Sequence, residues 1–270
     1  MVKALYIYHM NRKFRGLLCL SFILLCSSVT CAEISQYFDS EGNILSSDSR
    51  NREVTPPHGV QRSFVPEGIT LQNNVRYEFY PVFGKTYSEI VRSAEENSPA
   101  GPKNRRRLPS KSDWTVDWSY KIDYLEALDE EGKTVHASVE IYDISIAYHI
   151  KTTLPTLIDD TALNPAEKEL WKNYYHRLIE YEDDHARIIR DKDAQEELRK
   201  KFSELDYVVF DYSSNIDIDK TVETFIQKET ERIGREWLRN LKKRVDEYDR
   251  MTEFGIALQK KSSFFNQKEK

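Results

Sequence analysis

The hydrophobic period of this chain changes near Asn164, and that change constrains the fold more than any other feature. Before Asn164, apolar residues alternate with polar ones, as in Trp114, Val116, Trp118 and Tyr120. After it, they recur every three or four residues. A period of two is typical of strands with one buried face, and a period near 3.6 of amphipathic helices. The sequence therefore predicts a sheet followed by helices.

Three strands are expected, near residues 75, 115 and 140. The polar run at 130–133 contains Gly132 and joins the second strand to the third, which predicts an antiparallel hairpin. The apolar residues of the third strand change parity near Tyr142 and Asp143. Because a parity change needs an irregularity in the strand, we expect a β-bulge or a bend there.

Two long helices are expected after the sheet. The first runs from 165 to about 204 and begins with the cap signature Asn164, Pro165 and Glu167. The second runs from about 219 to 251, and Gly255 is a natural stop beyond its end. The predicted fold class is α+β, with a small antiparallel sheet packed against two long helices.

The N-terminal segment 1–32 has the pattern of a secretory signal peptide. It carries four basic residues and no acidic one, an apolar stretch at 17–26, and small residues up to Ala32. This predicts export to the periplasm or the extracellular space after cleavage at Ala32. Acylation of Cys31 as a lipoprotein anchor is the alternative. All three cysteines lie in this leader, so cleavage leaves no thiol for a disulfide, a nucleophile or a metal ligand.

The chain that follows the leader is acidic. The full chain has 45 acidic and 40 basic residues, four of the basic ones lie in the leader, and the mature chain therefore has a net charge of −9. Such a chain, with its charges interspersed, lacks the basic surface that nucleic acids require. No apolar segment after the leader is long enough to span a membrane. We expect a flexible arm at 33–70, a folded domain at 71–258 and a polar tail at 259–270.

A metal-site motif with one replacement lies in the first long helix. One segment matches His-Glu-x-x-His except at its first position, and it reads Tyr181-Glu182-Asp183-Asp184-His185. In that motif two histidines one helical turn apart bind zinc, and the glutamate takes a proton from the metal-bound water. Tyr181 stands in the place of the first histidine, so the chain keeps the general base and one of the two ligands of this motif.

Other residues extend the pattern over positions 75–256. In chain order they are 77–81, Gly84-Lys85-Thr86-Tyr87 with Glu89, Gly101-Pro102, Trp114, Trp118, Thr153-Leu154-Pro155, Trp171, Glu182 with His185, and 248–255. With these residues the chain resembles a bacterial family of predicted secreted zinc-dependent proteases, otherwise catalogued as a domain of unknown function. In that family a histidine in the final segment looks like the third zinc ligand.

The resemblance implies a role for each matching position. Glu182 corresponds to the general base and His185 to the second zinc ligand. Tyr181 and Phe254 stand where the family has its first and third ligands. The supporting positions of the final segment are matched by Tyr248, Asp249 and Thr252. Because a catalytic zinc normally has three protein ligands, this chain retains one of the three.

The replaced ligands leave three functions open. The leading hypothesis is an exported pseudoenzyme that holds no cofactor and binds a protein or peptide of the cell envelope through the former cleft. The alternative is a working metal-dependent peptidase, with Glu182 as general base and His185 as a zinc ligand assisted by Asp184, Glu253 or Tyr181. The third is a structural component of the envelope. These hypotheses differ in whether the pocket still holds a metal.

Overall fold

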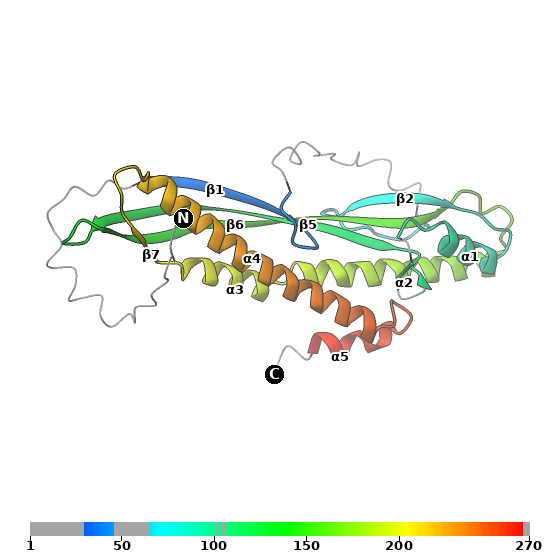
Figure 1. The fold of residues 1–270 in the computed structure, drawn as a ribbon. Helices are drawn as coiled ribbons and strands as arrows, with labels where there is room; N and C mark the ends of the chain where they lie inside the picture. The colour runs from blue at the N-terminus through cyan, green and yellow to red at the C-terminus, as the bar shows by residue number, and fades with distance from the viewer. Residues whose placement is uncertain (1–29, 46–64, 101, 104–105, 267–270) are drawn as a thin grey trace. The chain divides into compact units, whose positions relative to one another are not determined.

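The computed structural model describes residues 30–45, 65–100, 102–103 and 106–266 (Figure 1). Most of the predicted leader and much of the predicted arm lie outside these residues. The described chain is a mixture of strands and helices, two of the helices long, which confirms the α+β prediction. It is divided into two compact units, and the predicted domain at 71–258 contributes to both.

The first unit contains the described residues 30–36, 117–147 and 192–237. Its elements, some of which continue into the second unit, are β1 (Thr30–Asp39), β5 (Lys111–Leu128), β6 (Thr134–Leu157), β7 (Tyr207–Asp211), α3 (Lys192–Ser203) and α4 (Ile218–Met251). The ring of Trp118 packs edge-on against Phe202 of α3. A Cβ atom on Gly234 of α4 would come within 2.2 Å of the same indole, so only glycine fits there. The alternating face of β5 is therefore the core of this unit.

The hairpin predicted at 130–133 is present in the first unit. β5 and β6 are neighbours in the sheet, and the amide of Asp129 donates to the carbonyl of Thr134 across the turn at 2.9 Å. Within β6, Asp143 has a positive φ of 51°. Buried positions change parity around it, from Ile141 to Ile150. A left-handed residue inside a strand is the irregularity that the parity change predicts.

The second unit contains the described residues of 37–116, 148–191 and 238–270. It adds β2 (Arg76–Val82), α1 (Tyr87–Asn97), β3 (Pro102–Lys103), β4 (Arg106–Arg107), α2 (Pro165–Ile189), the 3-10 helix η4 (Leu258–Lys260) and α5 (Lys261–Asn266). β2 pairs with β6 in a parallel register from Arg76 opposite Lys151 to Val82 opposite Leu157. The sheet is therefore mixed: the expected antiparallel pairing is found between β6 and β7 but not between β2 and β6. The long connection between these strands, which includes α1 and β5, permits the parallel pairing.

The first long helix ends earlier than predicted. α2 begins with the predicted capping box, in which the side chains of Asn164 and Glu167 bind each other's backbone amides. It stops at Ile189, and α3 begins at Lys192. At the break, the carboxylate of Asp191 forms an ion pair of 2.5 Å with Arg244 of α4. The single helix predicted at 165–204 is thus two helices.

Both ends of the described chain are more ordered than the sequence suggested. Residues 33–39 of the predicted arm belong to β1, where Phe38 is fully buried and Gln36 is 6% exposed. The tail predicted from 259 forms η4 and α5, and Phe264 is 8% exposed. Burial of single aromatic side chains in short polar segments explains both differences, because such side chains give no periodic signal.

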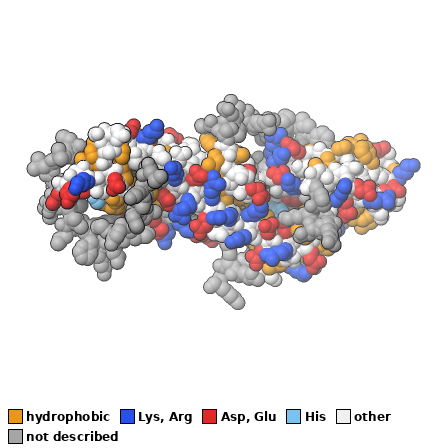
Figure 2. Space-filling view, in the orientation of Figure 1, with side chains coloured by type: hydrophobic (Ala, Val, Ile, Leu, Met, Phe, Trp, Pro, Cys, Tyr) orange, Lys and Arg blue, Asp and Glu red, His pale blue; other side chains and the backbone are white. Residues whose placement is uncertain are grey.

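The described surface carries interspersed charge. Acidic and basic side chains alternate over the face shown in Figure 2. Among the described residues, none of the helices is long and apolar enough to cross a bilayer. The predicted leader at 1–29 lies outside that search.

Candidate functional site

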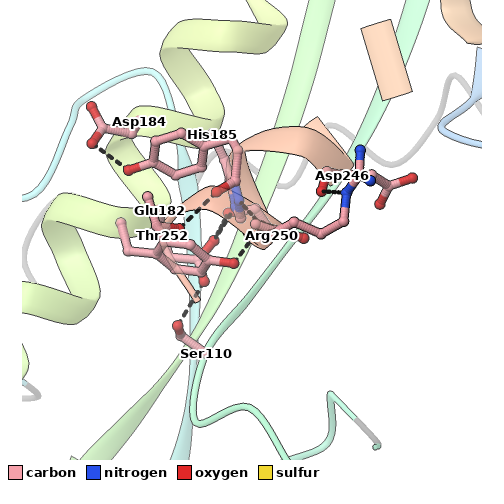
Figure 3. Close-up of polar contacts among 11 residues, drawn as sticks. Ser110, Glu182, Asp184, His185, Asp246, Arg250 and Thr252 are labelled. Atoms are coloured by element: carbon pink, nitrogen blue, oxygen red, sulfur yellow. Dashed lines mark hydrogen bonds and ion pairs between the residues drawn. The ribbon is translucent and has the colours of Figure 1, made fainter. Parts of the chain in front are cut away.

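The predicted site residues lie together in the second unit. Tyr181, Glu182 and His185 are buried on α2. Tyr248 and Asp249 are buried near the end of α4. The contacts between these two helices are drawn in Figure 3. The packing of α2 against α4 therefore brings together residues that are 64 and 68 positions apart.

His185 lies between two carboxylates. Its Nε2 is 2.7 Å from Oδ1 of Asp249, and its Nδ1 is 3.2 Å from Oε2 of Glu182. Burial lowers the pKa of His185, but hydrogen bonds to Asp249 and Glu182 and the charges of both carboxylates outweigh burial and raise the pKa to about 9. At neutral pH the imidazole is therefore protonated, and both of its N–H groups donate.

Glu182 is fixed by side chains that the sequence analysis did not single out. Ser110 donates to its Oε1 and Ser112 to its Oε2, each at 2.6 Å. The hydroxyl of Ser112 also lies 2.8 Å from that of Thr152 on β6. Figure 3 shows Ser110 pointing at Glu182. The sequence could not predict these contacts, because serine is common in loops and strands. They form only because the fold brings β5 and the residues before it against α2.

Tyr181, which stands at the predicted first ligand position, turns its hydroxyl to Asp249. The phenol donates a short hydrogen bond to the same Oδ1 that contacts His185. Burial, with the nearby charges of Asp249 and Glu182, raises the pKa of Tyr181 above its ordinary value. The phenol therefore stays protonated, and its ring packs against that of His185 with centroids 4.4 Å apart.

The two proposed substitute ligands are directed elsewhere. Asp184 accepts a hydrogen bond of 2.6 Å from the hydroxyl of Tyr248, and Lys261 lies 3.4 Å from the same oxygen. Glu253 is exposed and pairs with Lys260 at 2.6 Å. Both carboxylates therefore have partners away from His185.

Phe254 lies in a tight turn that follows α4. Glu253, Phe254 and Gly255 all have positive φ, and the amide of Phe254 donates to the carbonyl of Asp249 at 2.8 Å. Thr252 is fully buried and donates to the carbonyl of Tyr248 at 2.8 Å. The turn brings Phe254 to the wall of a cavity that Tyr181 also lines. The two replaced ligand positions thus border one space.

Two cavities meet at Tyr181. The first, the polar cavity, has a volume of about 230 Å³, and Ser112, Glu182, His185 and Asp246 line it beside apolar residues such as Ile189. The second has a volume of about 240 Å³ and is mainly apolar and aromatic. Its walls include Tyr87, Leu178, Tyr181, Phe254 and Ile256. The two cavities thus offer recesses of different polarity that share the Tyr181 side chain.

The side chains of this site bind one another. Within the described ranges, no cluster of three or more His, Cys, Asp or Glu side chains is arranged to hold a metal ion. A catalytic zinc normally has three protein ligands, and a phenylalanine has no donor atom. A hydrogen-bonded ion cluster is thus formed by Tyr181, Glu182, His185 and Asp249.

Sequence comparison assigns the chain to a family. A family model described as "Bacterial protein of unknown function (DUF922)" matches residues 77–255, which is most of the folded chain. The chain belongs to this family. The DUF922 region begins in β2 and ends at Gly255, so it includes every residue of the ion cluster but neither η4 nor α5. Searches of curated proteins and of solved structures found no match to the chain.

Proposed function

We propose that this protein is an exported, non-catalytic member of the DUF922 family that binds a protein or peptide of the cell envelope. One observation carries the proposal: Tyr181 and His185 both hydrogen-bond to Oδ1 of Asp249. The side chains at the first and second ligand positions are thus bound to one carboxylate. A zinc ion at these positions would have to displace both hydrogen bonds.

The surroundings of Glu182 also favour a non-catalytic role. A general base must reach a water molecule or a substrate proton within hydrogen-bonding distance. Oε1 of Glu182 accepts from Ser110, and Oε2 accepts from Ser112 and faces His185. The carboxylate is 3% exposed. Its chemistry is therefore that of a buried counter-ion.

The two cavities support a binding role. The polar cavity contains hydroxyls and carboxylates that can bind peptide groups, and the apolar cavity has the aromatic walls typical of sites for apolar side chains. A peptide or a surface loop of a partner is the class of ligand that offers both kinds of group along one chain.

The alternative function is a metal-dependent peptidase with an atypical site. One observation favours it: Glu182 and His185 lie side by side at the wall of the same cavity. In that function Glu182 would be the general base and His185 a ligand, assisted by Asp184, Glu253 or Tyr181. The ion pair between His185 and Asp249 would first have to open.

A peptidase assay separates the two functions. The natural protein and the Glu182→Gln variant are incubated with denatured protein substrates, with and without added zinc. The proposal expects the same background hydrolysis from both proteins. Hydrolysis by the natural protein that Glu182→Gln abolishes would establish the alternative.

Binding is tested by photo-crosslinking in cells. A photo-reactive amino acid replaces Asp246 at the polar cavity, and a second protein carries it at the partly exposed residue Lys172 on α2. The proposal expects a discrete crosslinked envelope protein from the cavity position and none from Lys172. Crosslinks that are equal at both positions, or absent from both, would contradict it.

Export is tested by the N-terminus of the mature protein. Cleavage after Ala32 predicts a first residue of Glu33 in the periplasmic or extracellular fraction. A chain that begins with a lipid-modified Cys31 would show the lipoprotein alternative, and an uncleaved chain in the cytoplasm would contradict export.

A further inference from the structure

The C-terminal segment beyond the DUF922 region folds back on the site-bearing helices. The family match ends at Gly255, and the chain continues through η4 to α5. Leu258 and Phe264 are 7% and 8% exposed. A six-residue helix such as α5 is unstable in isolation, because forming its first turn costs more free energy than one or two hydrogen bonds supply. The order of α5 therefore depends on what it contacts.

One set of contacts is electrostatic. Nζ of Lys261 lies 2.5 Å from a carboxylate oxygen of Glu180 and 3.4 Å from one of Asp184. Glu180 and Asp184 are four residues apart on α2, so they lie on one face of the helix. The side chains of Lys261 and Glu180 are partly exposed, and that of Asp184 is buried. Lys261 thus joins the first residue of α5 to the motif helix.

The other set of contacts is aromatic. The ring of Phe264 lies edge-on to Tyr248 of α4 with centroids 5.3 Å apart. The guanidinium of Arg187 on α2 lies 4.0 Å above the ring of Phe265. Edge-on ring pairs and cation–π pairs are both attractive at such distances. α5 therefore contacts α2 and α4 at once.

These contacts reach the ion cluster through Tyr248. Its hydroxyl donates to Asp184 at 2.6 Å, and its ring lies 5.6 Å from that of His185. Asp184 is in turn the second partner of Lys261. Tyr248 directly precedes Asp249 in the sequence, and Asp184 directly precedes His185. Movement of α5 would thus act directly on the side chains that support the cluster.

We infer that residues 258–266 form an intramolecular latch, which fixes α2 and α4 around the ion cluster and can open without unfolding the rest of the unit. The latch consists of two short helices outside the family region, and short segments held by a few side chains open locally before the body of a protein does. This inference does not depend on the proposed function, because the contacts are the same in a binding protein and in an enzyme.

Hydrogen exchange of the full-length protein tests the latch. The latch variant is Lys261→Met/Phe264→Ala, and the matched control is Ser263→Ala, which changes an exposed residue of the same helix. In the latch variant, amides at 180–187 and 246–252 should exchange about tenfold faster or more, as expected for a lowered cost of local opening. Amides at 165–172 in the same helix α2 should not change.

Two results would overturn the inference. Unchanged exchange at 180–187 and 246–252 would mean that α5 only rests on the surface. Equal acceleration throughout the second unit would mean that α5 belongs to its global fold. The single variant Lys261→Met, which keeps the methylene chain, provides the same comparison if the double variant does not fold. It should give a smaller acceleration confined to 180–187.

Discussion

Nε2 of His185 lies 2.7 Å from Oδ1 of Asp249, and this contact joins the motif helix α2 to the end of α4. The same oxygen accepts the hydroxyl hydrogen of Tyr181. The retained ligand position and one replaced position therefore converge on a single carboxylate. The buried charge of Asp249 is balanced by a protonated imidazole, which supplies the positive charge of the cluster.

Replacing His185 by glutamine should destabilise the protein strongly. The variant leaves the carboxylates of Glu182 and Asp249 buried beside a neutral amide, and loss of one partner of a buried ion pair typically costs about 3–5 kcal/mol. Urea denaturation measures the change in the free energy of unfolding. His176→Gln, at an exposed position of the same helix, should change it by less than about 0.5 kcal/mol. Equal effects of the two substitutions would contradict the ion-cluster account.

The stability of the protein should fall as the pH rises through the range of His185. Hydrogen bonds and charges from Asp249 and Glu182 outweigh burial and raise the pKa of His185 from 6.5 to about 9. A group whose pKa is raised on folding contributes its full stability below the unfolded pKa and loses it as the pH approaches the folded pKa. Urea midpoints should therefore decline between pH 6.5 and about 9. A decline of the same size in His185→Gln would mean that groups other than His185 cause it.

Removal of the Tyr181 hydroxyl should cost about 1–3 kcal/mol, because Asp249 then loses a buried hydrogen-bond donor. Tyr181→Phe keeps the ring and its packing against His185. Combined with Asp249→Asn in a double-mutant cycle, it should show a coupling of at least about 0.5 kcal/mol. Additive effects of the two substitutions would indicate that the phenol and the carboxylate do not interact.

Gly255 should tolerate alanine less well than Gly42. Both have positive φ, of 86° and 79°, which costs an alanine about 1 kcal/mol. A Cβ atom on Gly255 would also lie 3.2 Å from Cγ of Tyr181, whereas one on Gly42 meets no atom within 4 Å. The difference between the two losses of unfolding free energy isolates the contact with Tyr181. No difference would mean that Tyr181 moves aside freely.

The sequence predicted the parts of the fold that have a strong period. Alternation at Trp114–Tyr120 and the cap at Asn164 identified β5 and the start of α2 correctly. The parallel pairing of β2 with β6 could not be predicted, since strand direction depends on which distant segment supplies the neighbour. The order of 33–39 and of α5 was missed for the same reason: each depends on tertiary contacts of a few aromatic side chains.

In the site, too, some features could be predicted from the sequence and others depend on tertiary contacts. A spacing of four residues on a predicted helix puts Tyr181 and His185 on one face of α2, and both are buried. It gave no signal for Ser110 and Ser112, which reach Glu182 from β5 and the residues before it. Nor did it predict that Asp184 would face Tyr248 and Lys261, because neighbouring carboxylates on a helix differ in direction only through their tertiary partners.

The most direct test of the central claim is the metal content of two purified mature proteins, measured by elemental analysis after dialysis against trace zinc. One is the natural protein, and the other is Tyr181→His/Phe254→His, which restores both replaced ligand positions. We predict no tightly held zinc in the natural protein and nearly one zinc per chain in the variant. Stoichiometric zinc in the natural protein would contradict the account and favour a peptidase, and zinc in neither protein would show that these positions do not form a metal site.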